Sequence, residues 1–298
     1  MKLKLIALAA MLAASGVAQA KIANSNDNGN LSSGDMFASL VSVSNTASFT
    51  VDLGLRLDQF AAASVNADGV KLVWDMANSS FSDLSTVSTG LAGQLQTLNY
   101  GSVYSTFATP GVISASDLKF DIKAMDGLPT NFASAGQNRY LSTSAASSIT
   151  ATNGQVFGMD AVDTYIDAVN GDATNSTHGT AFNTAGANKF DSGDGVNVDF
   201  AAGGDQWNGK TSFSSTGAVS PTGINGGDLN FYFLTNTSGV AASQASVTKY
   251  AGVWSFDTAT AQLSYATAAP VPEAETYAMM LAGLGLVGFM VSRRRKLA

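Results

Sequence analysis

The aspartates of this chain all lie between residues 21 and 270, and that stretch contains neither glutamate nor cysteine. The chain has 22 acidic residues and two of them are glutamates, Glu273 and Glu275, so 22 − 2 = 20 are aspartates. Glutamate favours helix interiors, whereas aspartate, asparagine, glycine, serine and threonine favour turns and helix caps. The composition therefore predicts a turn-rich, all-β body with little helix over residues 21–270.

The first twenty residues have the three-part layout of a secretory signal peptide. Two lysines are followed by an apolar run over residues 5–14, and the segment ends with the small residues Ala18 and Ala20. The apolar run is too short for a stable membrane anchor, and its flanks do not suit a buried N-terminal helix. We therefore predict export, with cleavage by signal peptidase before Lys21.

The predicted body has to fold without disulfides and carries a strong negative charge. Residues 21–270 include nine lysines and arginines and all 20 aspartates, which gives 9 − 20 = −11. An exported chain without cysteine relies on core packing alone, and this length suffices for one large β domain or two smaller ones. The negative charge argues against nucleic acid as a partner, whereas divalent cations and neutral sugars remain compatible.

Short apolar and alternating segments predict most of the strands of the body. Residues 118–124 alternate apolar and charged side chains, the period-two pattern of a half-buried strand. One helix is expected over residues 161–169, with short helical turns at 55–63 and 91–95. Many short strands joined by polar turns predict a β-sandwich with jelly-roll-like connections. The predicted strands are residues 35–43, 47–53, 71–75, 118–124, 139–143, 229–234, 253–256 and 262–265.

Residues suited to catalysis are scarce in the sequence. The single histidine, His178, lies in a polar loop, and no Gly-x-Ser-x-Gly nucleophile motif occurs. No pair of aspartates stands out as the two carboxylates of a glycosidase. Trp74 and Trp254 lie in predicted strands and are expected in the core, which leaves Trp207 as a weak sugar-binding candidate. We predict that the protein is not an enzyme.

One cluster of oxygen ligands suggests a calcium loop. Hard cations need several carboxylate and carbonyl oxygens within one tight turn. The register does not fit an EF-hand, because aligning Gly195 with the invariant glycine places Phe190 at the first ligand position and Ala201 at the last. We therefore expect no required cofactor and weak or absent calcium binding. The candidate ligands are Asp191, Asp194, Asn197 and Asp199.

The C-terminal segment combines an uncharged run with a terminal cluster of cations. Residues 277–291 are 15 uncharged residues that would cover about 22 Å as a helix, against about 30 Å for a hydrocarbon core. A marginal transmembrane helix fits this length, with the cations on the cytoplasmic side, whereas a soluble core helix would not normally end in this way. A permanent anchor remains the main alternative. The cations are Arg293, Arg294, Arg295 and Lys296.

This C-terminal segment resembles a PEP-CTERM sorting signal of exported proteins from Gram-negative bacteria. The resemblance rests on an acidic proline motif, the apolar Leu-Ala-Gly-Leu-Gly-Leu run at 281–286 and the terminal arginines. It implies recognition by an exosortase, a membrane-embedded transpeptidase-like enzyme, in species that often make extracellular polysaccharide. Ala274 stands where the name-giving motif has a second proline. The motif residues are Val271, Pro272, Glu273 and Ala274.

Together these features predict three regions and an extracytoplasmic role. Residues 1–20 form the signal peptide, residues 21–270 the β-rich body and residues 271–298 the sorting signal with its transmembrane helix. The tail resides transiently in the inner membrane, and the body then reaches the outer envelope, the cell surface or the medium. We expect a structural or adhesive protein associated with exopolysaccharide. The alternative is a secreted carbohydrate-active enzyme or a calcium-dependent carbohydrate-binding protein.

Overall fold

The computed structural model describes the central part of the chain and a short piece of the tail. The described residues are 22, 34–42, 47–91, 93–95, 98, 104, 105, 107–109, 118–126, 134–157, 162, 166, 176, 177, 180–183, 223, 224, 227–268, 280–284 and 286.

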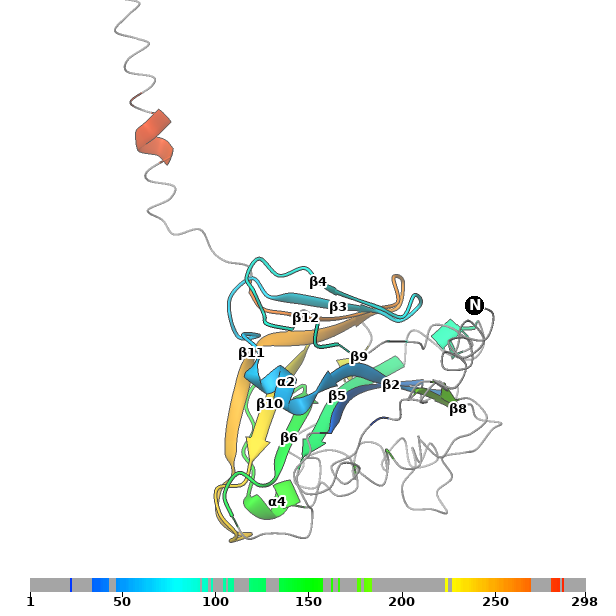
Figure 1. Cartoon of the computed structure of the whole chain (residues 1–298), viewed down its shortest axis with the longest axis vertical. Coiled ribbons are helices and arrows are strands. Elements are labelled where there is room, and N and C mark those ends of the chain that lie inside the picture. The colour runs from blue at the N-terminus through cyan, green and yellow to red at the C-terminus, as the bar shows by residue number, and fades with distance from the viewer. Residues whose placement is uncertain are drawn as a thin grey trace, which may run out of the picture.

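In the described part of the body, twelve strands form one antiparallel sheet (Figure 1). Eleven strands follow one another in the order β4-β3-β12-β11-β10-β6-β5-β1-β2-β8-β7, and β9 pairs with β5. The strands are β1 (Asp35–Ser42), β2 (Ala47–Arg56), β3 (Lys71–Asp75), β4 (Ser80–Asp83), β5 (Leu118–Asp126), β6 (Arg139–Ser144), β7 (Ser176–Thr177), β8 (Thr180–Asn183), β9 (Gly223–Ile224), β10 (Leu229–Thr235), β11 (Ser246–Asp257) and β12 (Gln262–Ala266).

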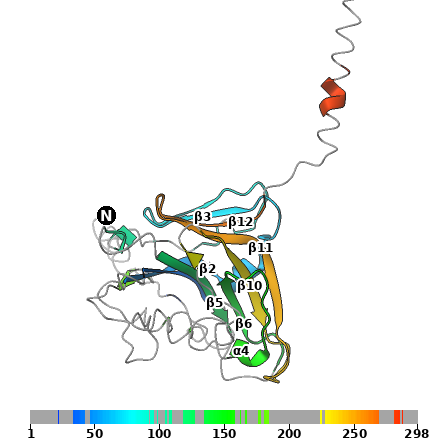
Figure 2. The ribbon, with the colours of Figure 1, turned by 180° about the vertical axis from the view of Figure 1, so that it is seen from behind.

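The nine strands from β4 to β2 form a curled sheet with one hydrophobic core on its inner side (Figures 1 and 2). Curling brings strands from opposite parts of the sheet together. The Trp74 indole N–H of β3 donates a hydrogen bond to the Leu53 carbonyl of β2, at 2.9 Å. Both side chains are completely buried. This bond links β3 and β2, which lie near opposite ends of the nine-strand sheet, across the core.

Aromatic side chains fill much of the inner core. The helix α2 (Leu57–Ala62) follows β2 directly and inserts Phe60 among aromatic rings of β10, β11 and β12. Its ring contacts Phe231, Tyr250, Trp254 and Tyr265, with centroid separations from 5.4 to 6.3 Å. Edge-to-face and offset aromatic contacts of this kind add to the stabilisation that comes from burial alone. The short helix therefore closes the inner face of the sheet.

A second hydrophobic cluster covers part of the outer face. Phe37 of β1, Tyr140 of β6 and Tyr232 of β10 pack there with residues of the second described helix, α4 (Asn153–Phe157). Ile22, the second residue after the predicted signal cleavage site, is also completely buried in this cluster. Central strands of the sheet are thus buried on both faces.

The structure is mostly β, as predicted, and the predicted strands recur, although β11 begins at Ser246, seven residues before the predicted start at Val253. The antiparallel pairing of β5 with β6 and the β11–β12 hairpin are as expected. A sandwich with jelly-roll connections is not confirmed, because hydrogen-bonded pairing of β6 with β10 and of β12 with β3 joins the strands into one sheet.

Two predicted details differ from the structure or are only partly covered by it. Residues 91–95 contain a turn in place of a helix, whereas the helix predicted at 55–63 is present as α2. Of the helix predicted at 161–169, the structure describes Val162 and Ile166, which are helical and buried. The sequence prediction missed α4 and the strands β4, β7, β8 and β9.

Candidate functional site: the tail and its exit from the sheet

The body ends where β12 leaves the sheet, and backbone hydrogen bonds hold its last residues. The Thr267 N–H donates to the Val70 carbonyl at 3.0 Å, and the Gly69 N–H donates to the Ala268 carbonyl at 2.9 Å. The Thr267 hydroxyl also donates to the Ala67 carbonyl at 2.8 Å. The chain is therefore fixed to the segment that precedes β3 until it enters the tail.

The loop that follows β4 lies against the other side of the same segment. The Thr86 N–H donates to the Gly69 carbonyl at 2.9 Å, and the Leu84 N–H donates to the Lys71 carbonyl at 2.8 Å. Gly69 thus contacts the exit of the tail through its N–H and the β4 loop through its carbonyl. This arrangement places the β4 loop beside the point where the tail leaves the body.

The described part of the tail is a short, exposed, apolar helix that stands apart from the sheet (Figure 1). It comprises residues 280–284 and 286, within the predicted transmembrane run. Its large apolar side chains are 57–65% exposed, so they are not packed in the core of the body. Among the residues that the structure covers, no helix is long and apolar enough to cross a membrane. The side chains in question are Met280, Leu281, Leu284 and Leu286.

Several predicted sites fall outside the residues that the structure describes. These are the signal peptide at 1–20, His178, the calcium candidates Asp191, Asp194, Asn197 and Asp199, Trp207, the motif Val271, Pro272, Glu273 and Ala274, and the cations Arg293, Arg294, Arg295 and Lys296. Within the described ranges, no group of three or more His, Cys, Asp or Glu side chains has the geometry of a metal site.

Comparison with protein families settles the nature of the tail. Residues 270–296 match the model for the PEP-CTERM protein-sorting motif. The chain carries a PEP-CTERM sorting motif. The match begins two residues after Ala268, the last described residue of the body, and it includes the exposed tail helix. No curated protein and no solved structure matches the chain.

The PEP-CTERM motif identifies the chain as an exported substrate of exosortase, a membrane-associated processing enzyme. The resemblance inferred from the acidic proline motif, the apolar run and the terminal cations is thereby confirmed. The matched residues are confined to the tail, and such tails occur on unrelated bodies, so the body's role has to be argued separately.

A buried ion pair on the outer face of β5 is the least expected polar feature of the body. Asp121 and Lys123 pair with each other, and both side chains are completely buried. Burial raises the pKa of Asp121 to about 6 although Lys123 opposes this shift, and burial lowers the pKa of Lys123. The alternating pattern predicted that these two residues face solvent, and this was wrong because the outer face is covered here. Sequence alternation carries no signal that separates a covered polar face from an exposed one.

A buried carboxylate pair lies on the same outer face, on the neighbouring strands β1 and β2. Burial, and then the nearby charge of Asp35, raise the pKa of Asp52 well above its usual range. The Gly54 N–H donates to Asp52 Oδ1 at 2.7 Å and partly offsets this shift. Buried acids of this kind are typical of catalytic sites and of covered structural faces alike.

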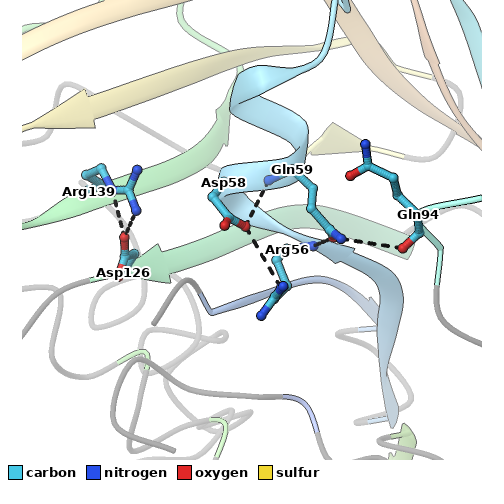
Figure 3. A network of polar contacts seen from close by, with 6 residues as sticks. All are labelled: Arg56, Asp58, Gln59, Gln94, Asp126 and Arg139. Atoms are coloured by element: carbon cyan, nitrogen blue, oxygen red, sulfur yellow. Dashed lines mark hydrogen bonds and ion pairs between the residues drawn. The ribbon is translucent and has the colours of Figure 1, made fainter. Parts of the chain in front are cut away.

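Other polar contacts serve local structure (Figure 3). The Arg56 N–H donates to Gln59 Oε1 at 2.8 Å, which satisfies a backbone group at the start of α2. The Gln59 amide donates to the Gln94 carbonyl at 3.5 Å and links α2 to the 93–95 turn. Where β5 ends and β6 begins, the Arg139 guanidinium pairs with the Asp126 carboxylate. These contacts position α2 and the ends of β5 and β6. The tail therefore remains the functional site for which a chemistry is assigned.

Proposed function

We propose that the protein is a non-enzymatic structural or adhesive component of the cell envelope or extracellular matrix, associated with exopolysaccharide. The PEP-CTERM motif at residues 270–296 is the observation that carries this proposal, because it dedicates the chain to sorting outside the cytoplasm. A rigid, highly paired β body without disulfides suits a protein that works by binding or scaffolding.

The order of events follows from the chemistry of the two ends. Signal peptidase removes residues 1–20, and the tail then enters the inner membrane with Arg293, Arg294, Arg295 and Lys296 on its cytoplasmic side. Proline lacks a backbone N–H and disfavours helical backbone at the residue before it, so we expect Pro272 to separate the motif from a continuous helix and leave Glu273 accessible at the membrane face. Exosortase acts on this segment and the body proceeds to the outer envelope, the cell surface or the medium.

Substitution of the motif tests this order directly. Glu273→Ala should leave full-length protein in the inner membrane, as should deletion of the exosortase. Glu275→Ala is the matched control, because it removes the neighbouring carboxylate outside the four-residue motif. Cell fractionation and immunoblotting then compare the variants. Normal release of Glu273→Ala would contradict the role assigned to the motif.

The association with exopolysaccharide needs a separate test, because sorting does not imply it. In a strain that makes no exopolysaccharide, we expect correctly processed protein to move from the cell-bound fraction into the medium. An unchanged distribution would refute the association while leaving the sorting intact.

We further expect that millimolar calcium leaves the melting temperature of the body unchanged, since a specific calcium site would raise it.

A further inference from the structure

The β4 loop, residues 84–88, presents exposed apolar side chains at the exit of the tail. Leu84 is 57% exposed and Val87 is 37% exposed. The sequence from Leu84 to Leu95 contains no charged residue. Single exposed apolar residues are ordinary on protein surfaces, and what distinguishes Leu84 and Val87 is their position beside the exit of the tail.

Hydrogen bonds fix this loop next to the tail. The Gly69 N–H bonds to Ala268 and its carbonyl accepts from Thr86, so one residue separates the loop from the last described residue of the body. The loop is also tied to β3, because the Lys71 N–H donates to Ser85 Oγ at 2.9 Å. Leu84 and Val87 therefore belong to the rigid end of the sheet from which the tail departs.

The charged group closest in sequence is turned toward the loop's own backbone and side chains. The Asp83 carboxylate accepts hydrogen bonds from the Ser85 N–H at 3.1 Å and from the Thr89 hydroxyl at 2.5 Å. Burial alone would raise its pKa, but these bonds hold the pKa of Asp83 below its usual range. Asp83 itself stays exposed, so Leu84 and Val87 lie next to an accessible acidic side chain whose hydrogen bonds order the loop.

The length of the tether limits what that partner can be. Eleven residues lie between Ala268 and Met280 of the tail helix, and this tether spans at most about 40 Å of extended chain. When the tail is inserted, the end of the sheet that carries the β4 loop therefore stays within about 40 Å of the inserted helix, because the tether starts at that end. Leu84 and Val87 lie in an uncharged stretch whose neighbours Asp68, Lys71 and Asp83 are exposed charged residues. Apolar side chains beside charged ones suit the boundary between headgroups and acyl chains.

We propose that the β4 loop is a membrane-contact surface, through which the body rests on the outer leaflet of the inner membrane while the tail is inserted. This inference rests on the proposed function, because it requires an inserted tail. The contact restricts the motion of the tether and holds the Pro272–Glu273 segment at the membrane face for the processing enzyme. Removal of the tail leaves only the weak loop contact, so the body is released.

The absence of cysteine makes a clean test feasible, because every introduced cysteine is the only thiol of the chain. Full-length protein from a strain without exosortase is reconstituted in phosphatidylethanolamine–phosphatidylglycerol vesicles. Three variants, Leu84→Cys, Val240→Cys and Met280→Cys, are labelled with an environment-sensitive fluorophore. Val240 is the matched control, because it is 59% exposed and lies near α4, at the other end of the sheet (Figure 1).

We expect lipids with brominated acyl chains to quench the labels at 280 and 84, with a blue shift at both, and to leave the label at 240 unaffected. Quenching at 280 without quenching at 84 would overturn the membrane-contact proposal and leave the sorting function standing. Equal quenching at 84 and 240 would also overturn it, since contact would then be unspecific. Lack of quenching at 280 would refute tail insertion itself, and the loop proposal with it.

A second experiment measures the consequence in cells. Leu84→Asp combined with Val87→Asp should slow the removal of the tail in a pulse-chase experiment, whereas Val240→Asp should process at the wild-type rate. These positions are exposed, and the far-UV circular dichroism of the purified variants verifies that the fold is kept. Wild-type processing kinetics in the double variant would contradict the proposal.

Discussion

Trp74 and Trp254 are both completely buried in the same core, yet their indole N–H groups differ. The Trp74 N–H donates to Leu53 across the curled sheet, whereas the described residues offer the Trp254 N–H no acceptor. Their ring centroids lie 5.2 Å apart, so the two side chains share one environment. This pair of residues separates the contribution of the bridging hydrogen bond from that of burial.

Trp74→Phe should therefore destabilise the protein more than Trp254→Phe. Both substitutions remove similar volume, but only the first leaves a buried carbonyl without its donor, a difference of about 1–3 kcal/mol in the free energy of unfolding. Urea denaturation of the purified exported protein measures both values. Equal losses would show that the bond contributes nothing to closing the sheet.

The buried Asp52 predicts an unusual pH dependence. Its pKa in the folded protein lies well above the value of about 3.9 expected when unfolded, so its ionisation opposes folding. This cost is absent below the unfolded pKa and grows as the pH rises toward the folded pKa. Asp52→Asn keeps an acceptor for the Gly54 N–H and cannot ionise, so its stability relative to wild type should improve from pH 4 to pH 7.

Asp257→Asn is the control for this experiment, because it should show the opposite trend. Hydrogen bonds from the Ala259 N–H and the Thr260 hydroxyl lower the pKa of Asp257. Its contribution is present above the unfolded pKa and is lost as the pH falls through the folded pKa. Urea denaturation at both pH values measures the two slopes. A pH-independent difference between Asp52→Asn and wild type would contradict the raised pKa.

At the scale of elements, the long hairpin of β11 and β12 depends on a close approach at Gly252. A Cβ atom there would lie 2.3 Å from Tyr265 Cζ, inside the ring's own volume. The Tyr265 hydroxyl accepts from the Gly252 N–H at 3.1 Å and lies 3.2 Å from the Val65 carbonyl, to which it donates. The ring cannot move away without breaking both bonds.

Gly252→Ala should accordingly lower the free energy of unfolding by about 1–3 kcal/mol or more, the usual cost of overpacking. Gly283→Ala in the tail helix is the matched control, because its Cβ would meet nothing within 4 Å. Thermal unfolding monitored by near-UV circular dichroism compares the two full-length variants in detergent. A Gly252→Ala protein as stable as the control would show that Tyr265 is free to move.

The elements differ in how far the sequence could predict them. Strands with several apolar residues, such as β5 and β10, are visible in the sequence because their inner faces alternate or run continuously apolar. The strand β4 has only Phe81 as an apolar residue and is ordered by pairing with β3, which local sequence does not encode. The single curled sheet was likewise not predictable, because it depends on long-range pairings such as β6 with β10. The tail was predictable because its motif, apolar run and cations follow one another in a fixed order within a short stretch of sequence.

At the scale of the whole molecule, a disulfide-free β body is joined to a tail whose apolar helix has no packing partner in the core. The inner core connects strands from both ends of the curled sheet. The tail leaves from one end of that sheet, beside the β4 loop. The separate roles of body and tail account for the distribution of acidic and basic residues along the sequence. The aspartates belong to the body and its turns, whereas the terminal cations serve the membrane insertion that we propose for the tail.

The proposed sorting depends on the fate of the two chain ends. Mature protein from the envelope or medium of wild-type cells should begin at Lys21 and lack residues 277–298, including the arginine cluster. Intact-mass spectrometry of that protein measures both ends at once, with protein from an exosortase-deficient strain as the reference for the uncut tail. Surface-exposed protein that retains its arginine cluster would contradict the account and make the tail a permanent anchor.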